Sequence, residues 1–393
     1  MWLEKLKKHK IWKIFNATDF NSLMFPCFFI CGIIGYFPYK WKRPVYLFSK
    51  TRFVISIFIL LLSIFIWFNL FYQLNFTNII KKNTAEVIHE NMYALLVGIG
   101  IITMHILSGT RLYMIQNLLK ISFILSEKDF NDLARRIHKK DILGFLYILI
   151  HLPNCFKSNI HVTLRNVTHL YILLINFSVD MFYINCVWVL KVCFKKLNKS
   201  IHELKKFQFD NDPRVETIVH HEQKNSLLLI KLKRLEEKHL EISDVVELVN
   251  DTFMIHIIVL VITTFTTITF NLYFFLLKIY SPETENIKFW FMPNIAPAFY
   301  FFIKFAMIIW ICESTTNEAK KIKWTLYDTF NDTTDPMVRR EVHLFSLQIM
   351  HRNNKFTAKT FDMNSVLLGQ ITKGILIYIL ILFQFLLNYR LCS

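Results

Sequence analysis

The sequence predicts an all-α polytopic membrane protein with seven transmembrane helices, its N-terminus inside the cell and its C-terminus outside. Of 393 residues, 54% are hydrophobic and 16% aromatic, with only 8 glycines and 9 prolines. The apolar residues form blocks close to the roughly 20 residues that cross a hydrocarbon layer about 30 Å thick. The basic residues lie mainly between these blocks, as is typical of cytoplasmic loops. This pattern excludes disordered chains and ordinary soluble domains.

Residues 1–52 are expected to form a cytosolic N-terminal segment that contains an interfacial helix. The segment is basic, and its apolar run over residues 23–37 contains Pro26, Gly32 and Gly35. The run also lacks a small-residue cleavage site, so we interpret it as a retained segment at the membrane interface and not as a signal peptide.

The apolar blocks that follow predict seven spans in chain order. The third is the shortest and contains His151 and Pro153. Residues 53–312 hold spans one to six, residues 313–364 form a cytosolic region, and residues 365–393 hold the seventh span with a short outer tail. The spans are expected at residues 53–72, 92–114, 142–156, 170–190, 253–277, 289–312 and 365–387.

The distribution of Lys and Arg tests the number of spans and their direction. The segments on the N-terminal side of the membrane hold 36 of the 46 Lys and Arg residues, and those on the other side hold 7. Without the third span, the 12 basic residues of positions 191–252 would move outside and the bias would be lost. Seven spans with the N-terminus inside are the reverse of a G-protein-coupled receptor. Residues 215–249 alternate apolar and charged residues at helical spacing, which predicts a cytosolic helical extension.

Common sequence motifs of catalytic and metal sites are absent. The sequence has no phosphate-binding glycine loop, no HExxH and no GxSxG, and its seven cysteines form no CxxC pair. A net charge of +17 is explained by membrane topology and not by nucleic-acid binding. We therefore expect no enzyme activity, no cofactor and no metal.

Two ionisable residues at membrane depth are candidates for function. Asp180 in span four and Lys304 in span six lie at depths that differ by less than about 10 Å at 1.5 Å per residue. They predict a buried ion pair or an aqueous cavity that includes Asn176, although polar contacts that only join helices remain an alternative. Arg111, near the inner end of span two, is expected to extend towards the interface.

The seventh span carries one distinct stripe. Lys373, Ile377, Ile381 and Gln384 recur every three or four residues and share one helix face. If copies of this helix surrounded an axis, the stripe would give a basic mouth, two rings of Ile and a Gln ring, as in a channel. Packing of the stripe against neighbouring helices of the same subunit is the alternative.

The same C-terminal residues resemble the insect gustatory receptor family, which is related to insect odorant receptors. The family signature is Thr-Tyr, five hydrophobic residues and Gln-Phe, and here residues 377–385 contain Tyr378, Gln384 and Phe385 with Ile377 in place of Thr. Residues 311–326 and 341–368 also resemble the family. The resemblance implies a ligand-gated, non-selective cation channel, a homotetramer or heteromer, in the plasma membrane of chemosensory neurons. It places Gln384 and Phe385 at the narrow outer part of the pore and a helix around residues 334–353 in a cytosolic intersubunit anchor.

The resemblance also implies a small-molecule tastant pocket among spans one to six, within residues 53–312, and an anchor role for the cytosolic region of residues 313–364. Sugar-receptor relatives often carry Glu where this chain has Ile379, so a bitter or plant compound is favoured over sugar. Tyr183, Trp188 and Tyr300 are candidate wall residues beside Asn176, Asp180 and Lys304. Two alternatives remain: a transporter that uses Asp180 and Lys304, and a subunit that conducts only with a partner receptor.

Overall fold

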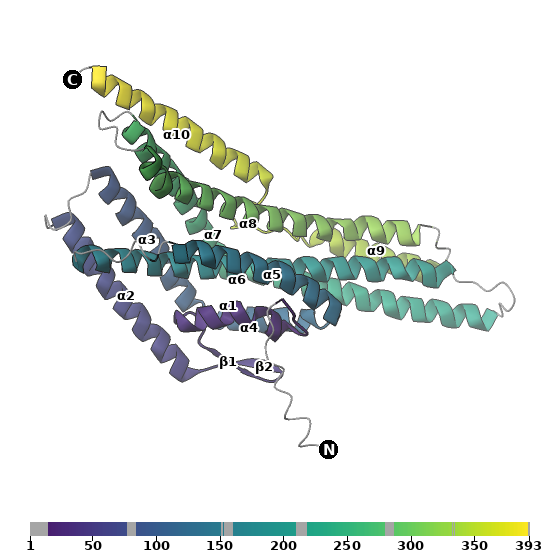
Figure 1. The fold of residues 1–393 in the computed structure, drawn as a ribbon. Helices are drawn as coiled ribbons and strands as arrows, with labels where there is room; N and C mark the ends of the chain where they lie inside the picture. Colours follow the sequence, from purple (N-terminus) through teal and green to yellow (C-terminus); the bar gives the residue numbers. More distant parts are fainter. Residues whose placement is uncertain are drawn as a thin grey trace.

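A bundle of long α-helices makes up the fold, as a computed structural model shows (Figure 1). The structure describes residues 15–76, 84–150, 152, 160–209, 218–279, 287–331, 333 and 335–391. A two-stranded antiparallel hairpin, β1 (Tyr39–Lys42) and β2 (Val45–Phe48), joins α1 to α2. The helices are α1 (Phe20–Ile33), α2 (Lys50–Phe76), α3 (Thr84–Ile106), α4 (Ser108–Ser122), α5 (Glu127–Ile150), α6 (Ile160–Phe209), α7 (Ile218–Ile279), α8 (Ile287–Phe330), α9 (Pro336–His351) and α10 (Ser365–Leu391).

Six helices of the described residues are long and apolar enough to cross a membrane: α2, α3, α6, α7, α8 and α10. The expected third span falls on the apolar C-terminal half of α5, whose N-terminal half is charged. Residues 151 and 153–156 of that span lie outside the described part of the chain. The all-α, polytopic membrane architecture predicted from the apolar blocks is therefore confirmed.

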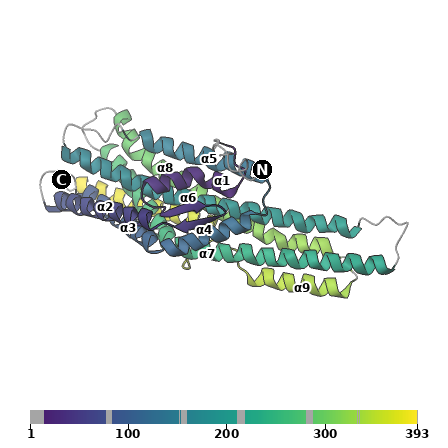
Figure 2. The ribbon, with the colours of Figure 1, turned by 90° about the horizontal axis from the view of Figure 1, so that it is seen from below.

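Three helices extend far beyond any membrane. With 50, 62 and 44 residues, α6, α7 and α8 are about 75, 93 and 66 Å long at 1.5 Å per residue. Figure 2 shows these helices running side by side past the rest of the bundle, with α9 alongside them. The amphipathic stretch expected at residues 215–249 forms the first half of α7 from Ile218 onwards. The helix expected around residues 334–353 is α9, whose N-terminus is capped by Asp335.

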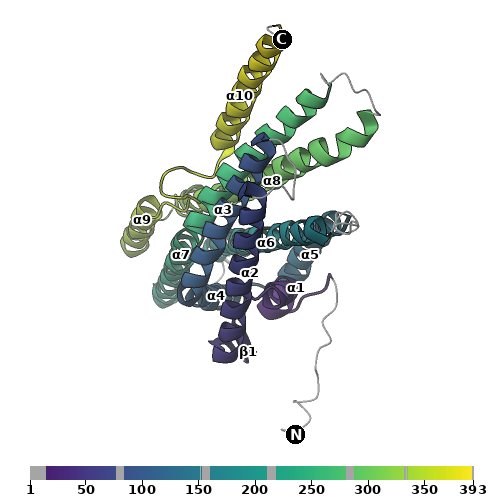
Figure 3. The same cartoon turned by 90° about the vertical axis from the view of Figure 1, so that its left-hand side faces the viewer.

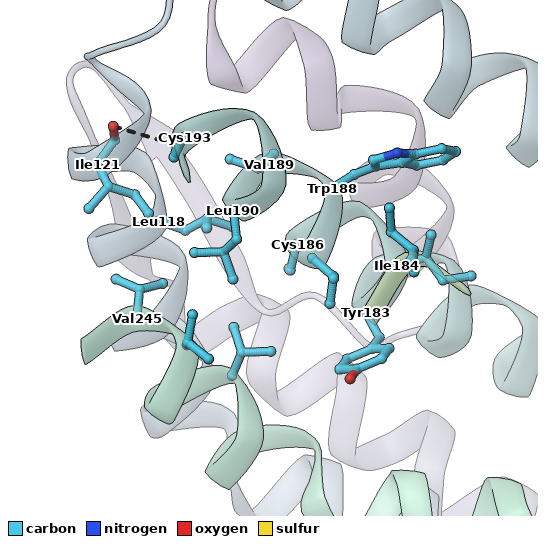
Figure 4. Packing of buried hydrophobic residues seen from close by; sticks show 14 of the residues in the cluster. Leu118, Ile121, Tyr183, Ile184, Cys186, Trp188, Val189, Leu190, Cys193 and Val245 are labelled. Atoms are coloured by element: carbon cyan, nitrogen blue, oxygen red, sulfur yellow. Dashed lines mark hydrogen bonds between the residues drawn. The ribbon is translucent and has the colours of Figure 1, made fainter. Parts of the chain in front are cut away.

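The core of the bundle is built around α6. Its most apolar window is 83% buried, whereas that of α2 is 6% buried and that of α10 is 11% buried. Figure 4 shows the inner part of α6 with Tyr183, Cys186 and Leu190 among side chains of neighbouring helices, including Leu118 of α4 and Val245 of α7. A helix that is apolar on all sides is stable only when other helices surround it. The other helices of the bundle therefore pack around the apolar part of α6.

Residues 15–49 of the expected N-terminal segment belong to the folded body, and residues 1–14 lie outside the described part of the chain. In α1 one face is buried against α5 and α6, including Leu23 and Cys27, while Phe25 and Phe29 are exposed and stack on each other. Asp19 forms a capping box with Ser22 at the start of the helix. These contacts fix the position of the chain that follows α1.

The placement of Arg111 corrects the expectation from the sequence. The predicted second span is divided at Leu107 into α3 and α4, so Arg111 lies in the first turn of α4. Its side chain is only 1% exposed and does not extend to the interface. The segment after α1 covers it, because the guanidinium lies 4.1 Å above the Tyr36 ring and Nε donates to the Tyr39 hydroxyl at 3.1 Å.

Gly35 provides a test of how this covering segment is held. Its φ of +81° is unfavourable for other residues, and an added Cβ would lie 2.9 Å from Cδ1 of Ile59. We expect Gly35→Ala to destabilise the fold by about 1–2 kcal/mol and to lower the midpoint of thermal unfolding, followed by tryptophan fluorescence in detergent. Gly32→Ala is the control, because a Cβ there meets no atom within 4 Å. Equal midpoints for the two variants would contradict this account.

Candidate functional site

A cluster of three ionisable side chains joins α6, α7 and α8 within the bundle. Lys304 Nζ donates to Asp180 Oδ2 at 2.5 Å, and His256 Nε2 lies 2.8 Å from Asp180 Oδ1. All three side chains are at most 5% exposed. The expected pair of Asp180 and Lys304 is therefore formed, with both carboxylate oxygens in contact with a nitrogen.

The cluster is held by geometry that compensates the cost of burial. Removing a carboxylate and an ammonium from water costs several kcal/mol each, which attraction offsets only where the remaining lone pairs are also bonded. His256 supplies that second bond to Asp180. The signal for this contact in the sequence is a histidine within a predicted membrane span, because ionisable residues there are rare and usually paired. The expected span boundaries, however, place His256 near the inner end of span five and Asp180 near mid-depth.

Aromatic rings lie next to the charged cluster. Lys304 Nζ lies 4.8 Å from the ring centroid of Phe301, which packs edge-on against Tyr93 of α3. Tyr300 stacks on Tyr147 of α5 with the ring centroids 4.0 Å apart. Four helices, α3, α5, α6 and α8, thus contribute side chains to this region. We call the group of Tyr93, Tyr147, Asn176, Tyr300 and Phe301 the aromatic cluster.

Three polar atoms of the aromatic cluster have no hydrogen-bond partner among the described residues. They are the hydroxyls of Tyr93 and Tyr300 and Nδ2 of Asn176, and all three are buried. A buried polar group without a partner costs about 1–3 kcal/mol. A ligand with its own hydroxyl or carbonyl would satisfy them, so the predicted residues Asn176 and Tyr300 belong to a region suited to bind a small polar aromatic molecule.

The structure places two other candidates away from the aromatic cluster. Tyr183, about two turns after Asn176 on α6, has its hydroxyl oxygen 3.2 Å from Cys312 Sγ and packs against Phe253. Trp188 packs edge-on against Trp310, and its ring centroid lies 5.8 Å from Lys140 Nζ. Both are buried in the core further towards the C-terminal end of α6. Conversely, sequence reasoning missed Tyr93 and Tyr147, because an aromatic residue in an apolar helix gives no sign of which face it occupies.

The predicted stripe of α10 lies on the face that is turned away from the rest of the chain. On this helix Ile375 is buried, and Gly374 and Tyr378 approach Phe265 of α7. Figure 3 shows α10 projecting from the bundle. All five predicted pore residues are exposed: Lys373, Ile377, Ile381, Gln384 and Phe385. Leu376, Tyr378 and Leu380 of the same helix are exposed as well, so the stripe is part of a largely uncovered helix surface.

The buried ion pair gives a testable prediction about stability. Lys304→Met leaves the Asp180 carboxylate buried without its cation, so we expect a destabilisation of about 3–5 kcal/mol. The double variant Asp180→Asn/Lys304→Met removes both charges and should regain part of that loss. Thermal unfolding of the purified protein in detergent measures both. Lys373→Met, at an exposed position of α10, is the control, and a loss of the same size there would contradict the prediction.

Comparison with known proteins agrees with this architecture. Two solved structures are similar to the chain: the insect olfactory receptor OR5 from Machilis hrabei (TM-score 0.67) and the same receptor in complex with eugenol (TM-score 0.68). Each is 13% identical in sequence, and the alignment covers 93% of this chain and 98% of the receptor chain. These structures share the fold. No curated protein matches the chain in sequence.

A sequence profile decides the family. The profile of the 7tm chemosensory receptors matches residues 24–389, which is nearly the whole chain and includes the charged cluster, the aromatic cluster and α10. The match begins within α1 and ends near the C-terminal end of α10. The chain belongs to the 7tm chemosensory receptor family.

Proposed function

We propose that the protein is a gustatory receptor that acts as a ligand-gated, non-selective cation channel, with α10 of each subunit lining a shared pore. The observation that carries the proposal is the exposed stripe of α10. Lys373 and Gln384 lie exposed on an apolar helix, and such groups are costly in hydrocarbon. A water-filled pore or a neighbouring copy of the same helix would satisfy them.

The order of residues along the stripe suits a channel. Lys373 would form a basic inner mouth, and Ile377 and Ile381 would form apolar rings at which the pore can close by dewetting. Gln384 and Phe385 would form the narrow outer part. The gustatory receptor signature has Thr at the position of Ile377, so the proposed pore would carry no hydroxyl at this level. In this arrangement the N-terminus is cytosolic and the C-terminus is outside.

Assembly into tetramers is supported by apolar residues on the long cytosolic extensions. Trp324 of α8 is 75% exposed, and Met337 and Met350 of α9 are 62% and 63% exposed. Apolar side chains on this scale in water indicate a protein contact. We propose that these helices form the anchor between subunits, either four identical chains or this chain with other gustatory receptors, in the plasma membrane of chemosensory neurons.

The aromatic cluster would be the tastant site. The stacked rings of Tyr147 and Tyr300, with the unpaired hydroxyls of Tyr93 and Tyr300 and the amide of Asn176 nearby, suit a planar molecule with few polar groups, whereas a sugar needs many hydrogen bonds. The similar receptor binds eugenol, a small phenolic plant compound. We propose a bitter or plant phenolic ligand. Its signal would pass along α8, which carries Tyr300 and whose Glu313 accepts a hydrogen bond from Ser365 at the start of α10.

Recording from cells that express this chain tests the pore. We expect a tastant-evoked cation current, and we expect Gln384→Ala to change its relative ion permeability because the amide lines the narrow part of the pore. Leu376→Ala is the control, since Leu376 is exposed on α10 but lies outside the stripe. A permeability change that is equal in both variants would contradict the assignment of the pore face.

Surface labelling and cross-linking must accompany the recording, because they separate the alternatives. Silent surface tetramers that conduct after co-expression with another receptor would indicate an obligate partner. Monomers with saturable uptake, abolished by Asp180→Asn, would indicate a transporter and contradict the channel.

The tastant site has a separate test. Tyr300→Phe removes a hydroxyl that has no partner in the protein, so the fold should be unaffected. For a phenolic agonist that accepts this hydrogen bond, we expect the half-maximal concentration to rise about 5- to 10-fold. Tyr72→Phe, at an exposed position of α2, should leave the dose-response curve unchanged. Unchanged curves for both variants across phenolic agonists would place the ligand elsewhere.

A further inference from the structure

A cavity lies between α2, α3 and α6, apart from the aromatic cluster. It has a volume of about 310 Å³, near the lower end of the size of ligand pockets. Its walls are formed by residues 59–68 of α2, 94–105 of α3 and 171–175 of α6. Ten helical residues span about 15 Å, so the cavity is elongated along the helices. None of the aromatic cluster or the charged cluster lines it.

The walls of this cavity are almost entirely apolar and open towards the membrane. Among the lining residues Phe68, Leu95 and Ile99 are themselves about half exposed. Both α2 and α3 are largely unburied in the chain. An apolar molecule in the bilayer could therefore enter sideways between α2 and α3.

One end of the cavity is polar, and a buried cation lies next to it. Tyr36 and His105 line this end, and Tyr36 is 2% exposed and has a hydroxyl without a hydrogen-bond partner. The Arg111 guanidinium does not line the cavity but lies over the Tyr36 ring at 4.1 Å, and its Nη1 is also buried without a partner. Among the described residues, no carboxylate lies within ion-pair distance of Arg111. A buried cation without a counter-charge is costly, and an anion beside it would be stabilised.

We propose that this cavity binds an anionic amphiphile, with its alkyl chain between α2, α3 and α6 and its negatively charged oxygens at the Tyr36 hydroxyl, close to the Arg111 guanidinium. The apolar slot suits a chain, and an unpaired hydroxyl beside a buried cation suits a carboxylate or phosphate oxygen. Arg52, which donates to the Tyr39 carbonyl at 2.6 Å, adds positive charge to the same region. The shared chemistry allows two sources, a free long-chain acid and the acyl chain of an anionic phospholipid.

The proposal is independent of ion conduction and of the tastant site. In the proposed topology the charged end lies at the inner end of α2 and α3, where the head groups of the cytoplasmic leaflet lie. A bound chain would fill the space that separates these helices. It would also supply the anion that Arg111 lacks within the chain.

Photolabelling of the purified full-length protein in phosphatidylcholine nanodiscs tests this site. The probe is palmitic acid with a diazirine near its methyl end, and we expect labelled peptides from residues 59–68 or 94–102. Gly98→Leu should reduce this labelling at least about 5-fold, because Gly98 lines the cavity and a Cβ there meets no atom within 4 Å. Gly109→Leu, at an exposed helical position with equally free space, should label as the unmodified protein does. Ala94→Phe is a second filling variant if Gly98→Leu folds poorly.

The charged end has its own arm of the experiment. Tyr36→Phe keeps the ring under Arg111 and removes only the hydroxyl, so it should weaken labelling by the acid about 5- to 10-fold and leave labelling by the matching long-chain alcohol unchanged. Competition by phosphatidylserine in the nanodisc would identify a lipid as the source, and competition by palmitate alone would identify a free acid. Equal labelling of Gly98→Leu and the unmodified protein would overturn the proposal. The proposal would also be overturned if the acid and the alcohol labelled the protein equally and Tyr36→Phe had no effect. Either of these outcomes would indicate that the probe contacts the protein only from the bulk lipid.

Discussion

The carboxylate of Asp180 is the constraint on which the arrangement of the inner helices depends. It lies in the most deeply buried stretch of α6, and its two oxygens contact Lys304 of α8 and His256 of α7. A buried carboxylate is tolerated only if such partners remain in place. The cluster therefore fixes the three longest helices at one level, from which they continue side by side out of the membrane.

The aromatic cluster owes its properties to the same constraint. Lys304 lies over Phe301, so the ion pair sets the position of the part of α8 that also carries Tyr300. Fixed helices hold the unpaired groups of Tyr93, Asn176 and Tyr300 in place, at a cost in stability. Such a cost is typical of a site that a ligand completes, and α8 connects this site to α10 through Glu313 and Ser365.

Burial is distributed very unevenly among the helices, and this unevenness relates to function. The most apolar window of α6 is 83% buried, whereas α2 and α10 expose most of their surface. On α2 the exposed residues include Phe58, Leu61 and Phe65, as suits lipid. On α10 they include Lys373 and Gln384, which lipid does not satisfy. The same exposure therefore indicates lipid contact for one helix and a pore or subunit contact for the other.

The sequence by itself determined the features that depend on local properties. Hydropathy located the membrane helices, helical periodicity located the stripe of α10 and the extension of α7, and depth along two helices was enough to pair Asp180 with Lys304. Only the tertiary structure decided which side chains meet across helices. It placed His256 beside Asp180, although the expected span boundaries put these two residues at different depths. It also buried Arg111, because the segment about 70 residues earlier in the chain covers its side chain. It also brought Tyr93, Tyr147 and Tyr300 together from three helices. Lateral contacts between apolar helices leave little trace in sequence, because hydrophobicity makes a residue compatible with lipid and with protein alike.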